Sequence, residues 1–106
     1  MTATADAINV ASTLPEQRRI LKTAIPGPES VARETERRAN VTDGLGITLP
    51  IFIERMAGGI IVDVDGNQLV DLASGIAVTS VGSSHPRVVA AVQDQVAKFT
   101  HTCFMV

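Results

Sequence analysis

Residues 60–72 read IIVDVDGNQLVDL, and this stretch decides the fold. Two runs rich in Ile, Val and Leu, 60–64 and 68–72, flank the segment Asp65-Gly66-Asn67. Gly and Asn tolerate a positive φ, and a short turn of such residues between two apolar runs is a strong signal for a β-hairpin. The sequence therefore predicts two antiparallel strands joined by a tight turn at 65–67.

The residues after the hairpin predict an extended piece and then a helix. We expect residues 76–81 to be extended, up to the small-residue segment 82–84. Pro86 suits the first position of a helix, with Ser84 or His85 as its N-cap. A helix is therefore expected to begin at Pro86.

Apolar side chains recur at helical spacing in this helix and form one stripe, made of Val88, Val89, Val92, Val96 and Phe99. We expect the helix to pack by this stripe, while Asp94 and Lys98 pair at i,i+4 on the other face. Residues 101–106, HTCFMV, then turn apolar and end without a polar cap. We expect the natural domain to be truncated at Val106.

The residues before the hairpin predict helices and a tail. Residues 1–11 are small and polar, and a disordered tail is expected there. Ser12 or Thr13 is expected to cap a short helix that runs through Lys22. A further helix is expected over 28–40, because Pro28 suits its first turn, although Val31 and Ala32 are nearly all it has to bury. Residues 45–53 are expected to form an extended loop or a short strand.

These elements divide the chain into the tail 1–11, an N-terminal helical arm 12–44, and a hairpin-plus-helix part 45–106. A chain of 106 residues is long enough for one small domain. Aromatic residues make up 3% of the sequence, with no Trp or Tyr, so the core has to come from Val, Ile, Leu and Ala. We therefore expect a thin aliphatic core.

The net charge of −2 excludes the basic footprint of a nucleic-acid-binding protein or of a protein bound to an anionic membrane. No apolar run approaches the roughly 20 residues that span a bilayer. The single Cys103 cannot form an internal disulfide, so a reducing cytoplasm is the expected compartment. Arg33, Arg37 and Arg38 are interleaved with glutamates, which favours a solvated helix face over a binding patch.

Other candidate sites are weak. Gly82-Ser83-Ser84 precedes a helix and could hold a phosphate, but Pro86 removes one N–H donor, so a turn of small residues is the favoured interpretation. His85, His101 and Cys103 lack the spacing of a zinc site. The hairpin aspartates Asp63, Asp65 and Asp71 lack the closing Glu of a calcium loop, so turn and strand-edge roles explain them.

Three stretches resemble a known enzyme family. Residues 62–78 look like the N-terminal hairpin and following strand of the class III pyridoxal-phosphate aminotransferases. Residues 81–86, VGSSHP, resemble the Gly-His-x-His-Pro motif with which a helix of that family begins. Residues 99–104, FTHTCF, are similar to the 4-aminobutyrate branch of the family. The resemblance covers about residues 45–106, and the first 40 residues are non-specific.

The resemblance implies a fold type I transferase, of which this chain would be an α+β segment (helix, β-hairpin, helix) from the N-terminal part. Such enzymes are normally homodimers that use pyridoxal 5'-phosphate, and this branch moves the amino group of 4-aminobutyrate to 2-oxoglutarate, giving succinate semialdehyde and glutamate. A lysine binds the cofactor covalently, and an aspartate holds its pyridine nitrogen. Ornithine or another ω-amino acid remains an alternative substrate. A non-catalytic interaction module that docks through the valine stripe is a further alternative.

Two lysines occur in the sequence, and neither suits that role. Lys22 lies beside Arg18 and Arg19, and Lys98 is expected to pair with Asp94 on a solvent face. A lysine that forms a Schiff base needs a cofactor pocket and a lowered pKa. We therefore assign no catalytic, cofactor-binding or metal-binding residue here, and we expect the chain alone to be inactive.

Three residues carry an expectation of substrate binding from the resemblance. Ile76 matches the family position that packs on the carbon chain of the substrate, and Gly75 keeps the backbone low beside it. Met105 falls where some members place a Gln that lines the substrate entrance, and Ser83 replaces a common His. For Ile76 and Met105, plain core packing is the alternative.

Overall fold

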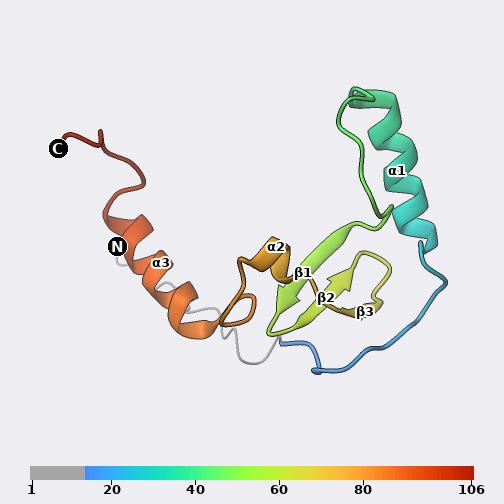
Figure 1. The fold of residues 1–106 in the computed structure, drawn as a ribbon, viewed down its shortest axis with the longest axis horizontal. Helices are drawn as coiled ribbons and strands as arrows, with labels where there is room; N and C mark the ends of the chain where they lie inside the picture. The colour runs from blue at the N-terminus through green and yellow to red at the C-terminus, as the bar shows by residue number, and fades with distance from the viewer. Residues whose placement is uncertain (1–13) are drawn as a thin grey trace, which may run out of the picture.

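The computed structural model describes residues 14–106; the expected tail at 1–11 and the expected caps Ser12 and Thr13 lie outside the described residues. The three strands of the described part form one antiparallel sheet in the order β1-β2-β3. Figure 1 shows α1 and α3 at opposite ends of the molecule, with the sheet between them. The predicted α+β architecture is confirmed. In chain order the elements are α1 (Pro28–Asn40), β1 (Ile53–Ala57), β2 (Ile60–Asp63), β3 (Gln68–Val70), α2 (Ser74–Ala77) and α3 (Pro86–Lys98).

The predicted hairpin is present, with β2 antiparallel to β3 and Ile61 opposite Leu69. Gly66 has φ +79°, as the turn requires. Both strands are shorter than predicted, because β2 ends at Asp63 and β3 ends at Val70. β2 ends at Asp63, where the side chain accepts the N–H groups of Asp65 and Asn67 and so begins the turn.

Residues 45–52 form a loop, which is one of the two alternatives expected for 45–53, and β1 begins at Ile53. It pairs with β2 through a turn at Gly58-Gly59, with Ala57 opposite Ile60. Gly58 also exchanges two backbone hydrogen bonds of 2.9 Å with Ser83, which ties the segment before α3 to the end of the sheet. The turn at Gly58-Gly59 therefore joins β1 to β2 and also holds the segment before α3.

The apolar core is small and aliphatic, as expected from the composition. Ala57, Ile60 and Val62 are its buried hydrophobic residues, each 4% exposed. Asp63 and Asn67 are fully buried beside them. Because buried polar groups are costly unless hydrogen-bonded, these two residues must satisfy each other or the backbone.

Asn67 meets this requirement by bonding the N-terminal arm, which we define as residues 14–27. Its Oδ1 accepts the N–H groups of Lys22 and Thr23 at 2.8 and 2.9 Å. Its Nδ2 donates to Thr23 Oγ1 at 2.9 Å and to Asp63 Oδ2 at 2.8 Å. Asp63 Oδ1 in turn accepts the N–H groups of Asp65 and Asn67. The turn therefore holds the arm by its buried side chains.

The expected short helix through Lys22 is wrong for the described residues, because the arm has no helical turn. Ile20 instead forms an isolated antiparallel bridge with Gln68, with N···O distances of 3.0 and 2.7 Å. Backbone groups that would have bonded within a helix bond the hairpin instead. The arm runs along the outer side of β3 as an extended segment.

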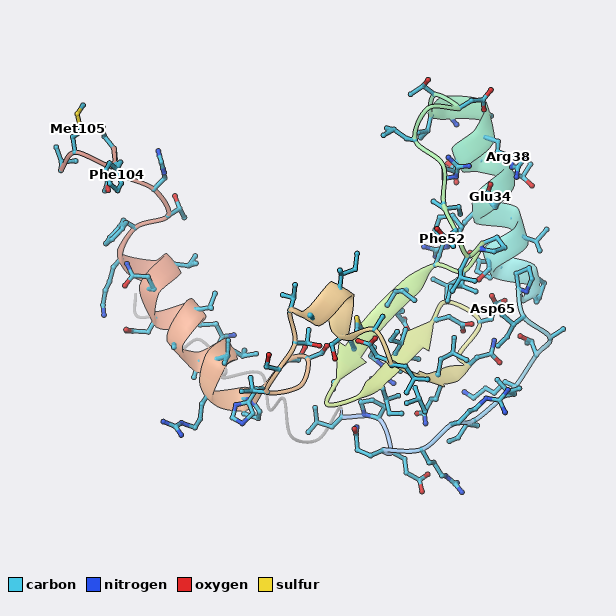
Figure 2. The ribbon with its side chains drawn as sticks, in the orientation of Figure 1. Glu34, Arg38, Phe52, Asp65, Phe104 and Met105 are labelled. Carbon is cyan, nitrogen blue, oxygen red and sulfur yellow. The ribbon has the colours of Figure 1, made fainter. Side chains whose placement is uncertain are left out.

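α1 has the predicted bounds, and its first turn is capped from the hairpin. The Asp65 carboxylate accepts the N–H groups of Glu29 and Ser30 at 2.7 and 3.0 Å, and the Ser30 hydroxyl at 2.7 Å. Figure 2 shows Asp65 directed toward the start of α1. A Cβ on Gly27 would overlap this carboxylate, so only Gly fits there. Partial burial acts to raise the pKa of Asp65, but the Ser30 and Glu29 hydrogen bonds outweigh it and lower the pKa.

The buried face of α1 is polar. Ser30 and Glu34 are its buried residues, whereas Val31 is 51% exposed, which corrects the expectation that Val31 and Ala32 would be buried. Arg37 and Arg38 both contact the Glu34 carboxylate at 2.7 Å. The hydrogen bond from Arg37, supported by Arg38, outweighs burial and lowers the pKa of Glu34 to about 2.

The basic cluster is neutralised within α1 itself. Arg33 pairs with Glu29 at 3.1 Å, one turn away, and Arg37 pairs with Glu34, which raises the pKa of Arg37. The Arg33–Glu29 pair lies between exposed side chains and adds little to stability, whereas the Arg37–Glu34 pair is largely covered. This pairing favours the interpretation as a solvated helix face over a binding patch.

α3 begins at Pro86 as predicted, and His85 is its cap, with Nδ1 accepting the Arg87 N–H at 3.3 Å. The expected Asp94–Lys98 pair is present at 2.6 Å. The expectation that α3 packs by its apolar stripe is wrong within the described chain, because none of its residues is buried. No described helix is long and apolar enough to cross a membrane.

Replacing Asn67 with Ala should destabilise the chain by about 3 kcal/mol, because it leaves several buried donors and acceptors without partners at about 1–3 kcal/mol each. Asn40→Ala is the matched control, since the Asn40 side chain bonds only the exposed end of α1, and it should change stability by less than about 0.5 kcal/mol. Urea unfolding followed by circular dichroism measures both. Equal effects of the two substitutions would refute the role of Asn67.

Glu34 predicts an acid-sensitive α1. The pKa of Glu34 is lowered from its ordinary value of 4.5, which applies to the unfolded chain, to about 2 in the folded chain. The stabilising effect of the ionised carboxylate is therefore complete above pH 4.5 and is lost as the pH falls toward 2. Glu34→Gln should flatten the loss of stability over this pH range, whereas the exposed Glu36→Gln should leave it unchanged. Unfolding midpoints at pH 6, 4 and 2.5 (about these values) measure this effect.

Candidate functional site

The segment that carries Gly75 and Ile76 forms one turn with left-handed backbone, which we call the left-handed turn (residues 74–77). The four φ values are 49° at Ser74, 59° at Gly75, 65° at Ile76 and 62° at Ala77. The expectation that residues 76–81 are extended is therefore wrong. The structure has α2 and a bend where the sequence predicted a strand.

Hydrogen bonds that the Asp71 carboxylate accepts explain where this turn begins. Asp71 Oδ1 accepts the N–H groups of Ala73 and Ser74 at 3.1 and 2.8 Å, which bends the chain directly after β3. The Ser74 carbonyl then accepts the N–H groups of Val78 and Thr79 at 2.7 and 3.1 Å. From the sequence, only a turn or strand-edge role is expected for Asp71. The Asp-x-Ala-Ser spacing, a carboxylate two and three residues before free N–H groups, is the signal that would have found it.

The left-handed turn stores backbone strain. Left-handed helical backbone costs roughly 1–2 kcal/mol per non-glycine residue, and a β-branched residue is rare there. Ser74, Ile76 and Ala77 all bear this strain, and Gly75 alone adopts the conformation freely. Packing does not offset the strain, because α2 has no buried residue and Ile76 is 89% exposed.

Met105 lies elsewhere. Figure 2 shows Phe104 and Met105 at the end of the chain beyond α3, and Met105 is 85% exposed. α3, which is 13 residues and about 20 Å long, lies along the chain between this end and the left-handed turn. The described chain therefore does not bring Met105 to Gly75 and Ile76. Core packing, the alternative for Ile76 and Met105, is excluded within the described residues by their exposure.

The start of α3 offers few free groups to an anion. The Ser83 N–H donates to Gly58 O, the Arg87 N–H donates to His85, and Pro86 has no N–H. A cavity of about 300 Å³ lies beside this segment, with mainly apolar walls that include Leu14, Ala57 and Val81. The segment 82–84 therefore acts as a turn that joins the sheet to α3.

Metal-binding geometry is not found in residues 14–106, which contain no group of three His, Cys, Asp or Glu side chains that could hold an ion. Asp63 and Asp65 are occupied by hydrogen bonds of the turn and of α1. Cys103 is a free, exposed thiol. The acidic and thiol groups therefore have structural or solvent-exposed positions.

The two lysines do not fit covalent attachment of pyridoxal phosphate. Lys98 Nζ is 2.6 Å from Asp94 Oδ2, and its side chain is 61% exposed. Lys22 is also exposed, and its side chain lies over Gly66 in the hairpin turn. Neither has the desolvated surroundings that a Schiff-base lysine needs. Neither Lys22 nor Lys98 therefore has surroundings that suit the attachment point of the cofactor.

Comparison with known proteins defines the family. The model of the family described as Aminotransferase class-III matches residues 44–106. The chain is a member of the class III aminotransferases. This result confirms the resemblance found in the hairpin and at the start of α3.

Among curated relatives, the 4-aminobutyrate aminotransferase of Mycobacterium tuberculosis (strain ATCC 25618 / H37Rv) is 62% identical over 91 residues, covering 86% of this chain and 20% of that protein. The 5-aminovalerate aminotransferase of Pseudomonas putida is 49% identical over 70 residues, covering 66% of this chain and 16% of that protein. This class III chain thus spans about a fifth of the length of the relatives that it matches.

Solved structures agree on the fold. The acetylornithine aminotransferase of Elizabethkingia anophelis matches with a TM-score of 0.66 at 25% identity, covering 73% of this chain and 20% of that one. The ornithine aminotransferase of Toxoplasma gondii matches with a TM-score of 0.64 at 27% identity, covering 73% and 18%. The predicted segment of a pyridoxal-phosphate aminotransferase fold is therefore confirmed.

The similarity reaches further toward the N-terminus than the sequence analysis expected. Any continuous stretch of 91 residues in a chain of 106 includes residues 16–91. The arm and α1 are therefore part of the similarity, although the first 40 residues were considered non-specific. Their hydrogen bonds to Asp65 and Asn67 give the physical reason, because the arm, α1 and the hairpin form one unit.

The strain in the left-handed turn predicts opposite effects of glycine at two neighbouring exposed positions. Ile76→Gly should stabilise the turn by about 1 kcal/mol, because Gly adopts a φ near 65° freely. Val78→Gly should weaken it, because Val78 has φ −101° and Gly there only adds chain entropy. Hydrogen exchange of the Thr79 N–H measures both. Faster exchange in Ile76→Gly would contradict the strain.

Proposed function

We propose that this chain forms the N-terminal part of a 4-aminobutyrate aminotransferase, which moves the amino group of 4-aminobutyrate to 2-oxoglutarate and gives succinate semialdehyde and glutamate. The observation that carries this proposal is the identity with the mycobacterial 4-aminobutyrate aminotransferases, which is higher and longer than that with the 5-aminovalerate enzymes. Substrate choice is a property of the side chains that line the site, so similarity in this segment bears on it.

The residues proposed to contact the substrate are Gly75, Ile76 and Met105. Ile76 projects from the left-handed turn without contacts that would bury it, so its side chain is free to pack on a carbon chain. 4-Aminobutyrate offers three methylene groups for such packing, and burying each contributes about 0.8 kcal/mol. Met105 is an adaptable apolar side chain suited to the entrance of such a site.

Pyridoxal 5'-phosphate, when bound, supplies the electron sink for the transfer of the amino group. The attachment lysine and the aspartate at the pyridine nitrogen belong to parts of the enzyme that have no counterpart here. In this proposal the chain provides a wall of the substrate site and not the reacting groups. The isolated chain is therefore inactive.

The proposal extends to assembly and location. The whole enzyme is a homodimer that works in the cytoplasm, where the exposed Cys103 stays reduced. The division into a tail (1–11), an arm (12–44) and a hairpin-plus-helix part (45–106) is retained as part of the proposal. Residues 14–27 are held against the last part, because Asn67 Oδ1 accepts the N–H groups of Lys22 and Thr23.

A related ω-amino acid is the second candidate for the amino donor. The 5-aminovalerate aminotransferase of Pseudomonas putida supports it, because it shares nearly half of its residues with this chain over the matched stretch. That substrate is one methylene longer than 4-aminobutyrate. A hydrophobic site discriminates a single methylene by only about 1–3 kcal/mol, so a direct comparison of the two donors is required.

A chimera tests the proposed function. This chain replaces the matching segment of the Mycobacterium tuberculosis 4-aminobutyrate aminotransferase, and transamination is measured with 4-aminobutyrate, 5-aminovalerate and ornithine. The chimera should retain kcat/KM for 4-aminobutyrate within about tenfold of the parent enzyme and should prefer it to the other donors. A folded, cofactor-loaded chimera without activity, or one that prefers another donor, would overturn the proposal.

The same chimera tests Ile76. Ile76→Ala should lower kcat/KM for 4-aminobutyrate about tenfold through lost packing on its carbon chain. Leu72→Ala is the matched control, because Leu72 is 92% exposed and carries no proposed role. The visible absorption of the bound cofactor confirms that both variants are loaded. Equal activity of the two variants would remove Ile76 from the substrate site.

A further inference from the structure

The segment between β3 and α3 is a loop that closes at both ends on one turn of the sheet. At its start the Asp71 N–H donates to the Gly59 carbonyl at 3.0 Å, and at its end Ser83 exchanges two hydrogen bonds with Gly58. A Cβ added at Gly82 would lie 3.1 Å from the Cα of Gly58, so the backbones approach closely there. The sheet therefore fixes both ends of this loop, and the left-handed turn lies between them.

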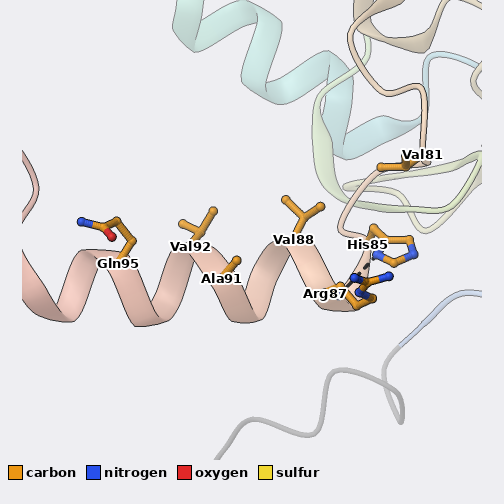
Figure 3. Close-up of a pocket in the computed structure, with 7 residues that line it drawn as sticks. All are labelled: Val81, His85, Arg87, Val88, Ala91, Val92 and Gln95. Atoms are coloured by element: carbon orange, nitrogen blue, oxygen red, sulfur yellow. Dashed lines mark hydrogen bonds between the residues drawn. The ribbon is translucent and has the colours of Figure 1, made fainter.

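The far end of the loop leads directly into α3. Figure 3 shows Val81 on the loop and His85 at the start of α3, where His85 Nδ1 accepts the Arg87 N–H. Val81 is 67% exposed, so its side chain contributes little packing. The loop is therefore held at this end chiefly by the backbone hydrogen bonds of Ser83.

Asp71 connects the fixed start of the loop to Ile76 through successive hydrogen bonds. Its Oδ1 accepts the N–H groups of Ala73 and Ser74 at 3.1 and 2.8 Å, which bends the chain. The Ala73 carbonyl, placed by this bend, accepts the N–H groups of Ile76 and Ala77 at 2.9 and 3.0 Å. An unbroken series of hydrogen bonds therefore leads from the sheet to the backbone of Ile76.

The backbone around Ile76 requires such a constraint. Ser74, Ile76 and Ala77 have unfavourable positive φ values, and in the described chain α2 has no buried residue to hold them. Strained backbone persists only where the surrounding structure fixes it. The half-buried Asp71 carboxylate supplies this constraint at the start of the turn.

We propose that Asp71 is a positioning residue, which sets where the Ile76 side chain meets the carbon chain of the amino donor. This inference rests on the proposed function, because it takes Ile76 as part of the wall of the substrate site. Asp71 acts through the backbone and does not touch the donor, since its Oδ1 is occupied by the two N–H groups.

Positioning and a merely structural role predict different kinetics. Packing on a part of the donor that does not react is equal in the bound state and in the transition state, so its loss raises KM and leaves kcat unchanged. Loss of folded enzyme instead lowers the apparent kcat at an unchanged KM, because fewer sites are active. The split between KM and kcat therefore separates the two roles.

The chimera described above, loaded with pyridoxal 5'-phosphate, tests the role of Asp71. Asp71→Ala should raise KM for 4-aminobutyrate about three- to tenfold with kcat within about twofold, since its effect cannot exceed the roughly tenfold effect of Ile76→Ala. Asp71→Asn keeps an oxygen that accepts the same two N–H groups, so its KM should stay within about twofold of the unchanged chimera. Asp94→Ala removes an exposed carboxylate on α3 and is the matched control, with both constants unchanged.

A double substitution shows whether Asp71 acts through Ile76. In the Ile76→Ala chimera, Asp71→Ala should change KM by less than about twofold, because the side chain that it positions is gone. The visible absorption of the bound cofactor shows which variants are loaded. Asp71→Glu keeps the charge but moves the acceptor by one methylene group; it replaces Asp71→Ala if that variant does not bind the cofactor, and it should also raise KM.

Each outcome decides the proposal. An unchanged KM in Asp71→Ala, a fall in kcat alone, or an equal effect with and without the Ile76 side chain overturns it. Equal impairment by Asp71→Asn and Asp71→Ala also overturns it, because the acceptor oxygen would then have no role. If Ile76→Ala raises KM and Asp71→Ala does not, the proposed function stands and the positioning role fails. A loaded chimera that is inactive with every donor overturns both.

Discussion

The structure depends on one buried contact, the hydrogen bond between the Asn67 amide and the Asp63 carboxylate in the hairpin turn. Both residues are fully buried, so each polar side chain would cost free energy if it lacked a hydrogen-bond partner. The penalty is avoided only when the arm supplies Lys22, Thr23 and its hydroxyl as partners. The need of Asn67 and Asp63 for hydrogen-bond partners therefore fixes the path of the arm, which lies more than 40 residues earlier in the chain.

The same turn organises α1 through a second carboxylate. Asp65 projects from the turn to cap the first N–H groups of the helix, so the arm and α1 are held by neighbouring residues. Within the described residues no buried side-chain nitrogen or oxygen lacks a partner. This half of the molecule has a small apolar core and a complete polar network. The half that follows β3 has neither, because it contains no buried residue.

Elements specified by nearby residues could be predicted from the sequence. Pro28 and Pro86 mark the starts of two helices, and Gly66 with Asn67 marks the turn, because these residues restrict the backbone directly. The arm could not be predicted, since its conformation depends on Asn67, which is distant in sequence. The left-handed turn also escaped prediction, because residues 76–81 read as a strand unless the Asp71 carboxylate is known to bend the chain first.

The sequence pointed to individual candidate site residues, but it did not predict where they lie relative to one another. The resemblance to the family pointed to Ile76 and Met105, and the structure puts them at separate, exposed positions on either side of α3. A stripe of valines indicates that a helix packs by that side, but it does not indicate which segment packs against it. Within the described chain the start of α3 is held to the sheet by the hydrogen bonds between Gly58 and Ser83, and no packing of the stripe adds to them.

This lack of packing links the strained turn to the uncovered helix. Both occur in the half of the chain without a core, where the backbone around Ile76 is held by short-range hydrogen bonds to Asp71, Ala73 and Ser74. Such a segment has little to resist rearrangement when a partner packs on it, because its native contacts are few and its φ values are unfavourable. The unfavourable φ values of Ser74, Ile76 and Ala77 therefore occur in the part of the described chain that has the least packing to hold them.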